Sequence, residues 1–340
     1  MSAIAALPGL DAIGYQRHAL HGEDSDWPEK NCYADLWIEL LGALELEPRA
    51  MLAFTLAVDF EGDQWTFFKP PLAELRALYG IDVQELTVWR PLIEHVTEHL
   101  SAGKLVSTEA DAFWLPDTAG TDYRQKHTKT TILVARIDTD ARTLGYFHNA
   151  GYFELQGEDF ERTFRLGEAH DPAFMPLFAE LVHLDRLVRR GPGELAAMSM
   201  DLLRHHYAWR PRTNPFTRFA ARMAQDMPLM GQAGMDRYHA WAFASIRQAG
   251  AAFELAAAHL RWLERASPGT PLSAAAAHFE AISKANKALI LKGARSVHTG
   301  KPLDVTALTR GMADDWDRGM ALVGEALASV DEVGARSRLD

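Results

Sequence analysis

The only cysteine of the chain, Cys32, lies where the sequence predicts the start of a helix. Apolar side chains recur from Tyr33 to Leu44 with the spacing of one buried helix face, and Asn31 is a favoured N-cap residue. Free backbone N–H groups and the helix dipole favour thiolate over thiol in a first turn, and they can also bind an oxyanion. Cys32 is therefore a candidate nucleophile, although a lone cysteine is commonly a small buried hydrophobe.

Two strand-like runs further along the chain predict a β-hairpin. Residues 127–137 and 142–149 are rich in Thr, Ile, Val and Tyr, and an Asp-rich link separates them. His127 begins the first run and Asn149 ends the second. If a three-residue link spans 137–139, the pairing register places His127 opposite Asn149.

Such a pair has a chemical use beside a thiol. The amide oxygen of Asn149 can accept one imidazole N–H of His127, which fixes the tautomer and leaves the other ring nitrogen for Cys32. The order Cys, His, Asn along the chain matches a nucleophile, a base and an orienting residue. The alternatives are structural, because His127 could cap a strand end and Asn149 could be a turn residue.

The elements that must position these residues differ between the two halves of the chain. In the first half, residues 51–58 and 83–88 have the pattern of short buried strands, and residues 104–110 that of a third strand. Residues 71–79 and 91–103 are predicted helices, each with proline at its start and glycine at its end.

Long Ala- and Leu-rich runs follow after about residue 170. Residues 251–266, 273–297 and 305–333 have helical spacing of apolar side chains, with Gly- and Pro-containing breaks between them. The pattern in this half of the chain predicts a bundle of five to seven helices. We therefore expect an α+β protein with an α/β domain over residues 1–165 and an all-α domain over residues 166–340.

Composition excludes several classes of protein. With a net charge of −11 over 340 residues, a general nucleic-acid binder is not expected. No apolar run is long enough to cross a bilayer, and the N-terminus is a poor signal peptide, so no membrane association is predicted. One cysteine excludes a disulfide framework and a multi-thiolate metal site, which favours a cytoplasmic protein. The sequence predicts no metal site and no cofactor, and it leaves the oligomeric state open.

A basic segment interrupts this acidic chain. Eight arginines lie between Arg186 and Arg222, against Glu194 and Asp201. One interpretation is a set of solvated helix faces; the other is a local surface for one acidic partner or ligand.

The motifs support a resemblance to a known family. The pattern is carried by Asn31-Cys32 followed by Asp111, Phe113, Leu115, Pro116, Tyr123, His127 and Asn149. It resembles the papain-like N-terminal domain of the butirosin biosynthesis acyltransferase family. The whole chain, with the run RPRTNPFTRF at 210–219, also resembles a bacterial family of unknown function.

The first resemblance implies acyl or aminoacyl transfer from a carrier-protein thioester or an amide through Cys32, with His127 as base and Asn149 as orienter. Asn31, Asp26, Asp111 and Tyr123 would then contact substrate. An acidic carrier protein with a phosphopantetheine arm would be the partner, bound by a second set of residues: Arg210, Arg212, Asn214 and Arg218.

One position departs from the papain-like pattern. A glutamine that completes the oxyanion hole is usual about six residues before the cysteine, but this chain has Asp26 there, whose carboxylate would repel an oxyanion. Asp26 could instead recognise an amine or a cation together with Asp24, Glu109 and Asp111. Two other functions therefore stay open, a cysteine hydrolase with the same triad and a non-catalytic binding protein that retains the fold.

Overall fold

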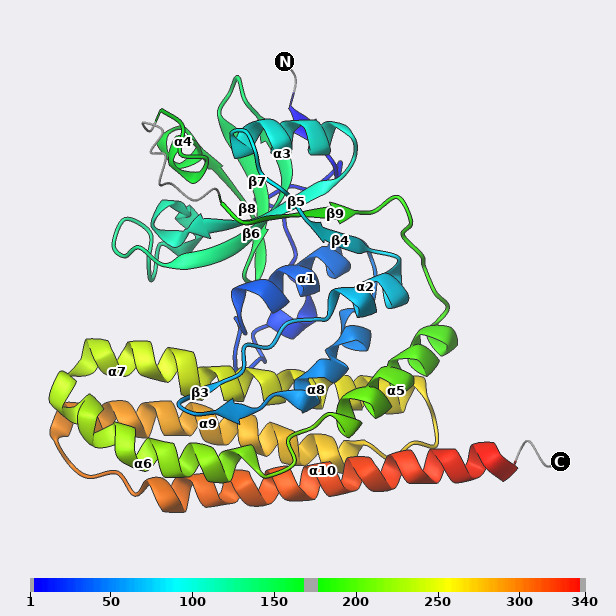
Figure 1. The fold of residues 1–340 in the computed structure, drawn as a ribbon, viewed down its shortest axis with the longest axis vertical. Coiled ribbons are helices and arrows are strands. Elements are labelled where there is room, and N and C mark those ends of the chain that lie inside the picture. The colour runs from blue at the N-terminus through cyan, green and yellow to red at the C-terminus, as the bar shows by residue number, and fades with distance from the viewer. Residues whose placement is uncertain (1–2, 168–176, 337–340) are drawn as a thin grey trace. The chain divides into compact units, whose positions relative to one another are not determined.

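An antiparallel sheet and a bundle of helices form the cores of two separate units in the computed structural model, which describes residues 3–167 and 177–336 (Figure 1). The predicted α+β class is confirmed. Each unit is discontinuous in sequence. The first, here called the sheet unit, comprises Met1–Gly22, Asn31–Glu47 and Leu72–Arg189. The second, the helical unit, comprises Glu23–Lys30, Pro48–Pro71 and Arg190–Asp340.

The main sheet of the sheet unit has the strand order β4-β9-β5-β6-β7-β8, and β1 pairs with the far end of β6. Every pairing is antiparallel. The strands are β1 Ile4–Ala5, β4 Asp82–Glu85, β5 Leu105–Asp111, β6 Lys129–Asp138, β7 Thr143–His148, β8 Gly151–Gln156 and β9 Ala179–His183. The last strand lies beyond residue 165, so the sheet extends further along the chain than the expected domain boundary.

Four α-helices belong to the sheet unit within the described ranges: α1 Cys32–Ala43, α2 Leu72–Tyr79, α3 Leu92–Ser101 and α4 Glu158–Thr163. The predicted helices at 71–79 and 91–103 are confirmed as α2 and α3. Helix α1 packs on β6, β7 and β8, and α3 packs on β5 and β6 from the opposite face (Figure 1). The helix that begins with the cysteine is therefore the cover of one sheet face.

The hairpin of β6 and β7 has a different register from the one predicted. Asp138 pairs with Thr143, so a four-residue connection replaces the three-residue link over 137–139. The Asp138 carboxylate accepts the N–H groups of Asp140 and Ala141, and this turn fixes the connection. A bulge between Val134 and Arg136 shifts the pairing again.

One predicted strand is wrong. Residues 51–58 fall mostly within the 3₁₀ helix η2, Pro48–Ala57, which packs against α5 and α8 in the helical unit. Nearly the whole segment is buried, and apolar residues therefore follow one another almost without interruption. Such a run shows neither the period of a strand nor that of a helix, so the sequence pattern could not distinguish the two. The neighbouring prediction at 83–88 is confirmed in part, because β4 covers Asp82–Glu85.

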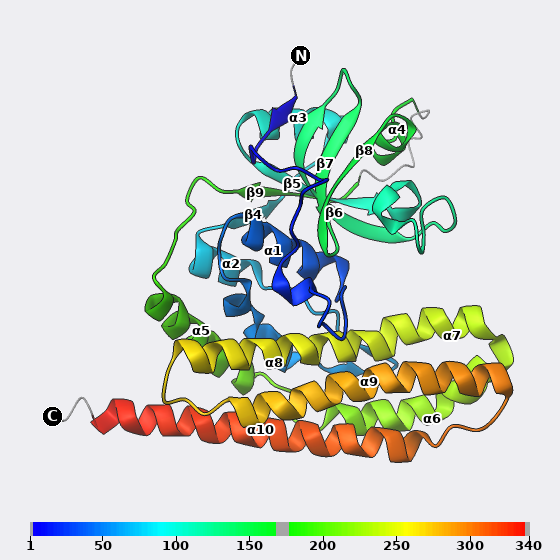
Figure 2. The same ribbon diagram turned by 180° about the vertical axis from the view of Figure 1, so that it is seen from behind.

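Six α-helices form the bundle in the described part of the helical unit, which confirms the predicted five to seven. They are α5 Pro192–Ala208, α6 Pro215–Ala233, α7 Met235–Ala242, α8 Gln248–Ala266, α9 Ser273–Thr299 and α10 Val305–Arg336, with a π-helical turn, Phe243–Arg247, between α7 and α8. Helices α8, α9 and α10 lie side by side (Figure 2). Over residues 3–167 and 177–336, no helix combines the length and apolar character needed to span a bilayer.

An aromatic cluster forms the core of the helical unit. A short hairpin of β2 Phe60–Glu61 and β3 Gln64–Trp65 supplies Trp65, whose ring centroid lies 4.9 Å from that of Phe216. Phe216 in turn contacts Phe253, and Phe253 contacts Phe279, at 5.3 and 5.5 Å. Segment 48–71 is thus a structural part of the bundle, although it precedes most of the sheet in sequence.

Candidate active site of the sheet unit

Cys32 is the first residue of α1, as predicted, and its side chain is half-buried. The side-chain oxygen of Asn31 accepts the N–H groups of Tyr33 and Ala34, at 3.1 and 2.8 Å, so Asn31 is the expected N-cap. These two N–H groups are therefore not available to an oxyanion. The N–H group of Cys32 itself has no hydrogen-bond partner among the described residues.

The residue after the cysteine ties the start of α1 to the sheet. The hydroxyl of Tyr33 donates to the carboxylate of Glu180 on β9 at 2.9 Å, and both side chains are buried. Burial raises the pKa of Tyr33 far above its usual value, and the charge of Glu180 raises it further. Tyr33 therefore stays protonated and holds the first turn of α1 in place.

A second buried network lies along α1 and was not predicted from the sequence. His21 contacts two carboxylates of the helix, with Nε2 at 3.0 Å from Asp35 and Nδ1 within hydrogen-bond reach of Glu39. Tyr15 also donates to Glu39, at 2.6 Å. Because carboxylates only accept, both ring nitrogens of His21 carry hydrogen. The i, i+4 spacing of Asp35 and Glu39 was the available signal.

Opposing effects act on the pKa of His21 in this network. Burial lowers it, but the charges and hydrogen bonds of Asp35 and Glu39 raise it, and the net shift is upward. The imidazolium therefore compensates buried negative charge on the helix that carries Cys32.

His127 lies in the loop that precedes β6, and its ring is fixed on two sides. Nδ1 donates to Oδ2 of Asp111 at 2.6 Å, and the ring stacks on Phe113 with centroids 4.3 Å apart. The side chain is nevertheless 69% exposed, so Nε2 is open to a ligand. Asp111 was expected to contact substrate; it holds His127.

The first turn of α1 and the His127–Asp111 pair face the same side of the sheet. Tyr33 reaches Glu180, and Glu180 pairs with Ser107 of β5. Paired residues share a face, as do alternate positions along a strand, so Asp111 lies on this face too. Asp111 is four residues from Ser107, which corresponds to about 13 Å of strand.

Asn149 does not take the expected place beside His127. It lies in the two-residue connection between β7 and β8, with φ of 44°, so the turn interpretation of this residue is the correct one. In β6 and β7, Leu133 is opposite Phe147. This register takes Asn149 away from the start of β6, where His127 lies.

The residue next to Asn149 has a clear structural role. Buried His148 donates from Nδ1 to Asp117 at 2.6 Å, and its Nε2 lies 2.7 Å from the hydroxyl of Thr130. Tyr146 donates to the other oxygen of Asp117 at 2.6 Å. The network fastens the loop over residues 112–128, which carries His127, to β6 and β7.

Tyr123, expected to contact substrate, also fastens this loop. Its hydroxyl donates to Asp159 of α4 at 2.9 Å, and Arg124 donates to the same carboxylate at 2.6 Å. Tyr123 therefore positions the loop against α4.

A cavity of about 510 Å³ opens beside His127. Trp114 lines it together with charged side chains of both signs: Lys129 pairs with Glu109 at 2.9 Å, and Arg162 pairs with Glu158 at 3.8 Å. The hydroxyl of Thr163, which also lines the cavity, is buried and has no hydrogen-bond partner. The cavity thus combines an oriented imidazole with paired charges of both signs and an unsatisfied hydroxyl.

The remaining predicted residues belong to the helical unit. The N–H of Asp26 donates to Glu254 at 2.6 Å, and its carbonyl accepts from Lys287 at 2.6 Å, so its backbone is anchored to α8 and α9. Asn214 caps α6 and donates to Ala313 at 2.8 Å.

Half of the eight arginines of the basic segment pair with carboxylates of the protein. Arg218 pairs with Asp59, which the count of charges along the segment could not reveal. Three further pairs are Arg190–Glu194, Arg204–Asp201 and Arg222–Asp226. These contacts favour the interpretation of ordinary helix faces for half of the arginines. Among the described residues, no carboxylate pairs with the other four, which are Arg186, Arg189, Arg210 and Arg212.

Metal-ligating side chains do not gather in the part of the chain that the structure describes: no group of three or more His, Cys, Asp or Glu could hold an ion there.

Two protein-family models match the chain in sequence. Residues 16–184 match the DUF1839 N-terminal domain, and residues 193–325 match the DUF1839 C-terminal domain. The break between the matches lies close to Arg189, where the sheet unit ends. No curated protein matches the chain. Since the two models together cover most of the sequence, the chain belongs to the DUF1839 family.

Proposed function

We propose that the sheet unit is a papain-like acyltransferase domain in which Cys32 is the nucleophile, His127 the general base and Asp111 the residue that orients His127. The observation that carries the proposal is the 2.6 Å bond from Nδ1 of His127 to Asp111, which leaves Nε2 open. A helix that begins with cysteine and packs on an antiparallel sheet is the arrangement that the papain-like resemblance implies.

The Asp111 bond gives His127 a defined role. A carboxylate accepts only, so Nδ1 carries hydrogen and Nε2 has a free lone pair in the neutral ring. The stacked Phe113 limits rotation of the ring. Asp111 thus supplies what the sequence assigned to Asn149, and with a stronger, charge-assisted bond.

The proposed reaction has two halves. First, Nε2 of His127 takes the thiol proton of Cys32, and the sulfur attacks the carbonyl carbon of a thioester. Collapse of the tetrahedral intermediate expels the donor thiolate, which takes the proton from His127. An amine then attacks the acyl-cysteine and transfers one proton to His127, which returns it to the departing Cys32 sulfur.

Charge on the intermediate needs hydrogen-bond donors. The N–H of Cys32 is the one first-turn donor that Asn31 does not occupy, so we assign it to the oxyanion. The donor would be a thioester on the phosphopantetheine arm of an acidic carrier protein, and the phosphate of that arm would compete with Glu109 for Lys129 and with Glu158 for Arg162.

The proposal requires one movement. Within the described residues, no hydrogen bond joins Cys32 to His127, although both lie on one face of the same unit. Because Asp111 and Phe113 hold the His127 ring, the end of β5 and the loop that follows it must approach the first turn of α1 together with His127 when substrate fills the cavity.

The test uses the full chain and an acyl thioester of N-acetylcysteamine. We expect one acyl group on Cys32 by peptide mass spectrometry, no label in Cys32→Ala and slow labelling in His127→Asn. His99→Asn, on α3, is the matched control and should label normally. Loss of the label only when an amine is added indicates a transferase, and loss in water alone indicates a hydrolase. Unlabelled Cys32 in folded protein, with both the model thioester and an acyl carrier protein, would contradict the proposal.

A further inference from the structure

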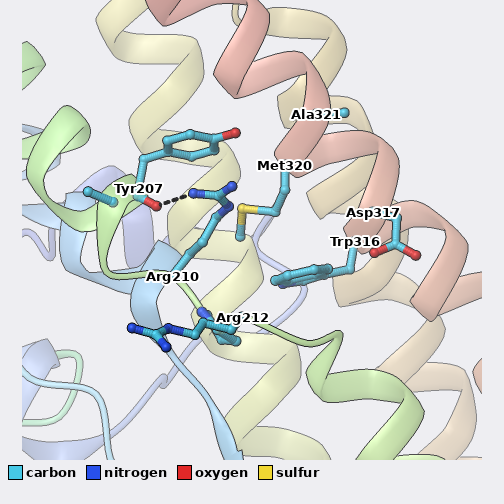
Figure 3. A pocket seen from close by; sticks show the side chains of 9 residues that line it. Tyr207, Arg210, Arg212, Trp316, Asp317, Met320 and Ala321 are labelled. Carbon is cyan, nitrogen blue, oxygen red and sulfur yellow. Dashed lines mark hydrogen bonds between the residues drawn. The ribbon is translucent and has the colours of Figure 1, made fainter.

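A second cavity, of about 470 Å³, lies within the helical unit, where the turn after α5 meets α10 (Figure 3). Tyr207 at the end of α5 and Arg210 and Arg212 of the turn line one side, and Trp316 and Met320 line the other side from α10. Cations on one wall and large apolar side chains on the other are the composition of a small-molecule site.

Arg210 is held in one orientation. Its guanidinium carbon lies 3.8 Å from the centroid of the Tyr207 ring, and Nη1 donates to the Tyr207 carbonyl oxygen at 2.7 Å (Figure 3). In the described part of the chain its other N–H groups have no partner, and the side chain is half-buried. A guanidinium that is fixed but mostly unpaired presents its donors to an anion without further ordering cost.

The position of the Tyr207 ring, on which Arg210 stacks, depends on a glycine of α10. A Cβ atom at Gly324 would lie 2.3 Å from the hydroxyl of Tyr207, so Tyr207 occupies space that only glycine leaves open. The close approach couples the Tyr207–Arg210 stack to the helix that forms the opposite wall.

Arg212 adds a second positive charge at the mouth of the cavity. It is exposed and has no ion pair within the described ranges, unlike Arg218 and Arg222 on the following helix. Figure 3 shows its guanidinium extending away from α10 and from the guanidinium of Arg210. Arg212 therefore attracts an anion to the mouth of the cavity through its charge, and it does not bind the anion jointly with Arg210.

The α10 wall supplies apolar contact. Trp316 and Met320 are 6% and 3% exposed, and their side chains face the turn in Figure 3. Asp317 also borders the cavity, but its carboxylate points away from the Trp316 ring. An anion at Arg210 is thus directed away from the one carboxylate of the lining.

We propose that this cavity binds a small organic anion, with a carboxylate or phosphate group on Arg210 and an apolar part against Trp316 and Met320. The inference goes beyond the proposed acyl transfer. It concerns other residues of another unit, and its test contains no thioester.

Isothermal titration of the full chain tests the proposal with four probes: phenyl phosphate, phenylacetate, inorganic phosphate and benzyl alcohol. We expect saturable binding of one phenyl phosphate or phenylacetate per chain, weaker binding of inorganic phosphate and none of benzyl alcohol. The stronger of the two aromatic probes identifies phosphate or carboxylate as the preferred group. Failure of both aromatic anions to bind saturably, or equal binding of benzyl alcohol, would overturn the proposal.

Three variants localise the site. Arg210→Ala should weaken the aromatic anion by about tenfold or more, as expected for loss of a charge-assisted bond. Gly324→Ala, which displaces Tyr207, should weaken it while all charges remain. Arg212→Ala should weaken it chiefly at low salt. Arg237→Ala, an exposed arginine of α7, is the control, and an equal loss in this control would show binding elsewhere.

Discussion

The Nδ1 atom of His127 donates to Oδ2 of Asp111 at 2.6 Å, across the start of β6 and the end of β5. The contact arises because Asp111 pairs with Lys129, two residues after His127, in the antiparallel ladder. Asp111 therefore has two tasks, since its other oxygen accepts the N–H groups of Phe113 and Thr128 and shapes the loop. The account of catalysis depends on this carboxylate.

Asp111→Asn should slow acylation of Cys32 by about 100-fold, because the amide can donate to Nδ1 and favour the wrong tautomer of His127. The measurement is the rate of acyl labelling under single-turnover conditions. Asp138→Asn, in the β6–β7 turn, is the control and should label at the normal rate. A normal rate in folded Asp111→Asn protein would exclude Asp111 as the orienting residue.

Asn149 should be dispensable for catalysis and sensitive only to backbone strain. With φ of 44°, Asn149→Ala should destabilise the sheet unit by about 1 kcal/mol, whereas Asn149→Gly should not. Both variants should label Cys32 at the normal rate. A large loss of labelling in Asn149→Gly would restore the triad that the sequence predicted and argue against Asp111.

His21 should stabilise α1 at low pH and lose this effect as the pH rises. Its pKa in the folded protein is raised, so its contribution is fully present below its unfolded value of about 6.5 and disappears as the pH passes the folded pKa. His21→Gln should cost about 3 kcal/mol in mildly acidic solution.

Hydrogen exchange of the α1 amides measures this effect at several pH values. The difference in opening free energy between the native chain and His21→Gln should shrink with rising pH. A constant difference across the range would mean that His21 is not charged in the folded protein.

His259 in the helical unit should destabilise the protein at low pH, which is the opposite of the effect of His21. Burial lowers its pKa to about 4, while Nδ1 donates to the carbonyl oxygen of Arg49 at 2.8 Å. Its contribution is therefore present above about pH 6.5 and is lost as the pH falls toward 4, up to about 3 kcal/mol.

Hydrogen exchange of the α8 amides measures this loss of stability in the native chain and in His259→Asn. The asparagine keeps an N–H donor and does not titrate. The native chain should lose more stability than the variant between neutral and acidic pH. His298→Asn, at an exposed position of α9, should follow the native chain. Parallel curves for the native chain and His259→Asn would show that His259 takes up its proton equally well in the folded state.

Local features of the site were predictable from sequence. The Asn31 cap and the position of Cys32 depend on a few neighbouring residues and on one helical period, and both predictions hold. Pairing at a distance was not predictable. The β6–β7 connection begins two residues later than predicted and is one residue longer, and together with one bulge this places Asn149 away from His127. Asp111 was identified through family resemblance but given a different role.

The division into units shows the same limit. Nothing in the local sequence of segments 23–30 and 48–71 indicates that they belong to the helical bundle. Only their contacts in the folded structure assign them to it. The strand β9 was missed because it is short and follows the sheet at a distance in sequence. The ion pair of Arg218 with Asp59 could not be predicted, because the two residues are far apart in sequence.

Single-turnover acylation of Cys32 by the N-acetylcysteamine thioester, a substrate that fills the cavity, tests the central claim, which is that His127 takes the proton of this thiol. The rate should be measured at neutral and mildly acidic pH in the native chain, His127→Asn and the control His99→Asn. We predict that only His127→Asn slows the reaction, by about tenfold or more, because the thiolate forms through the imidazole. Identical rates in the three folded proteins would contradict the account.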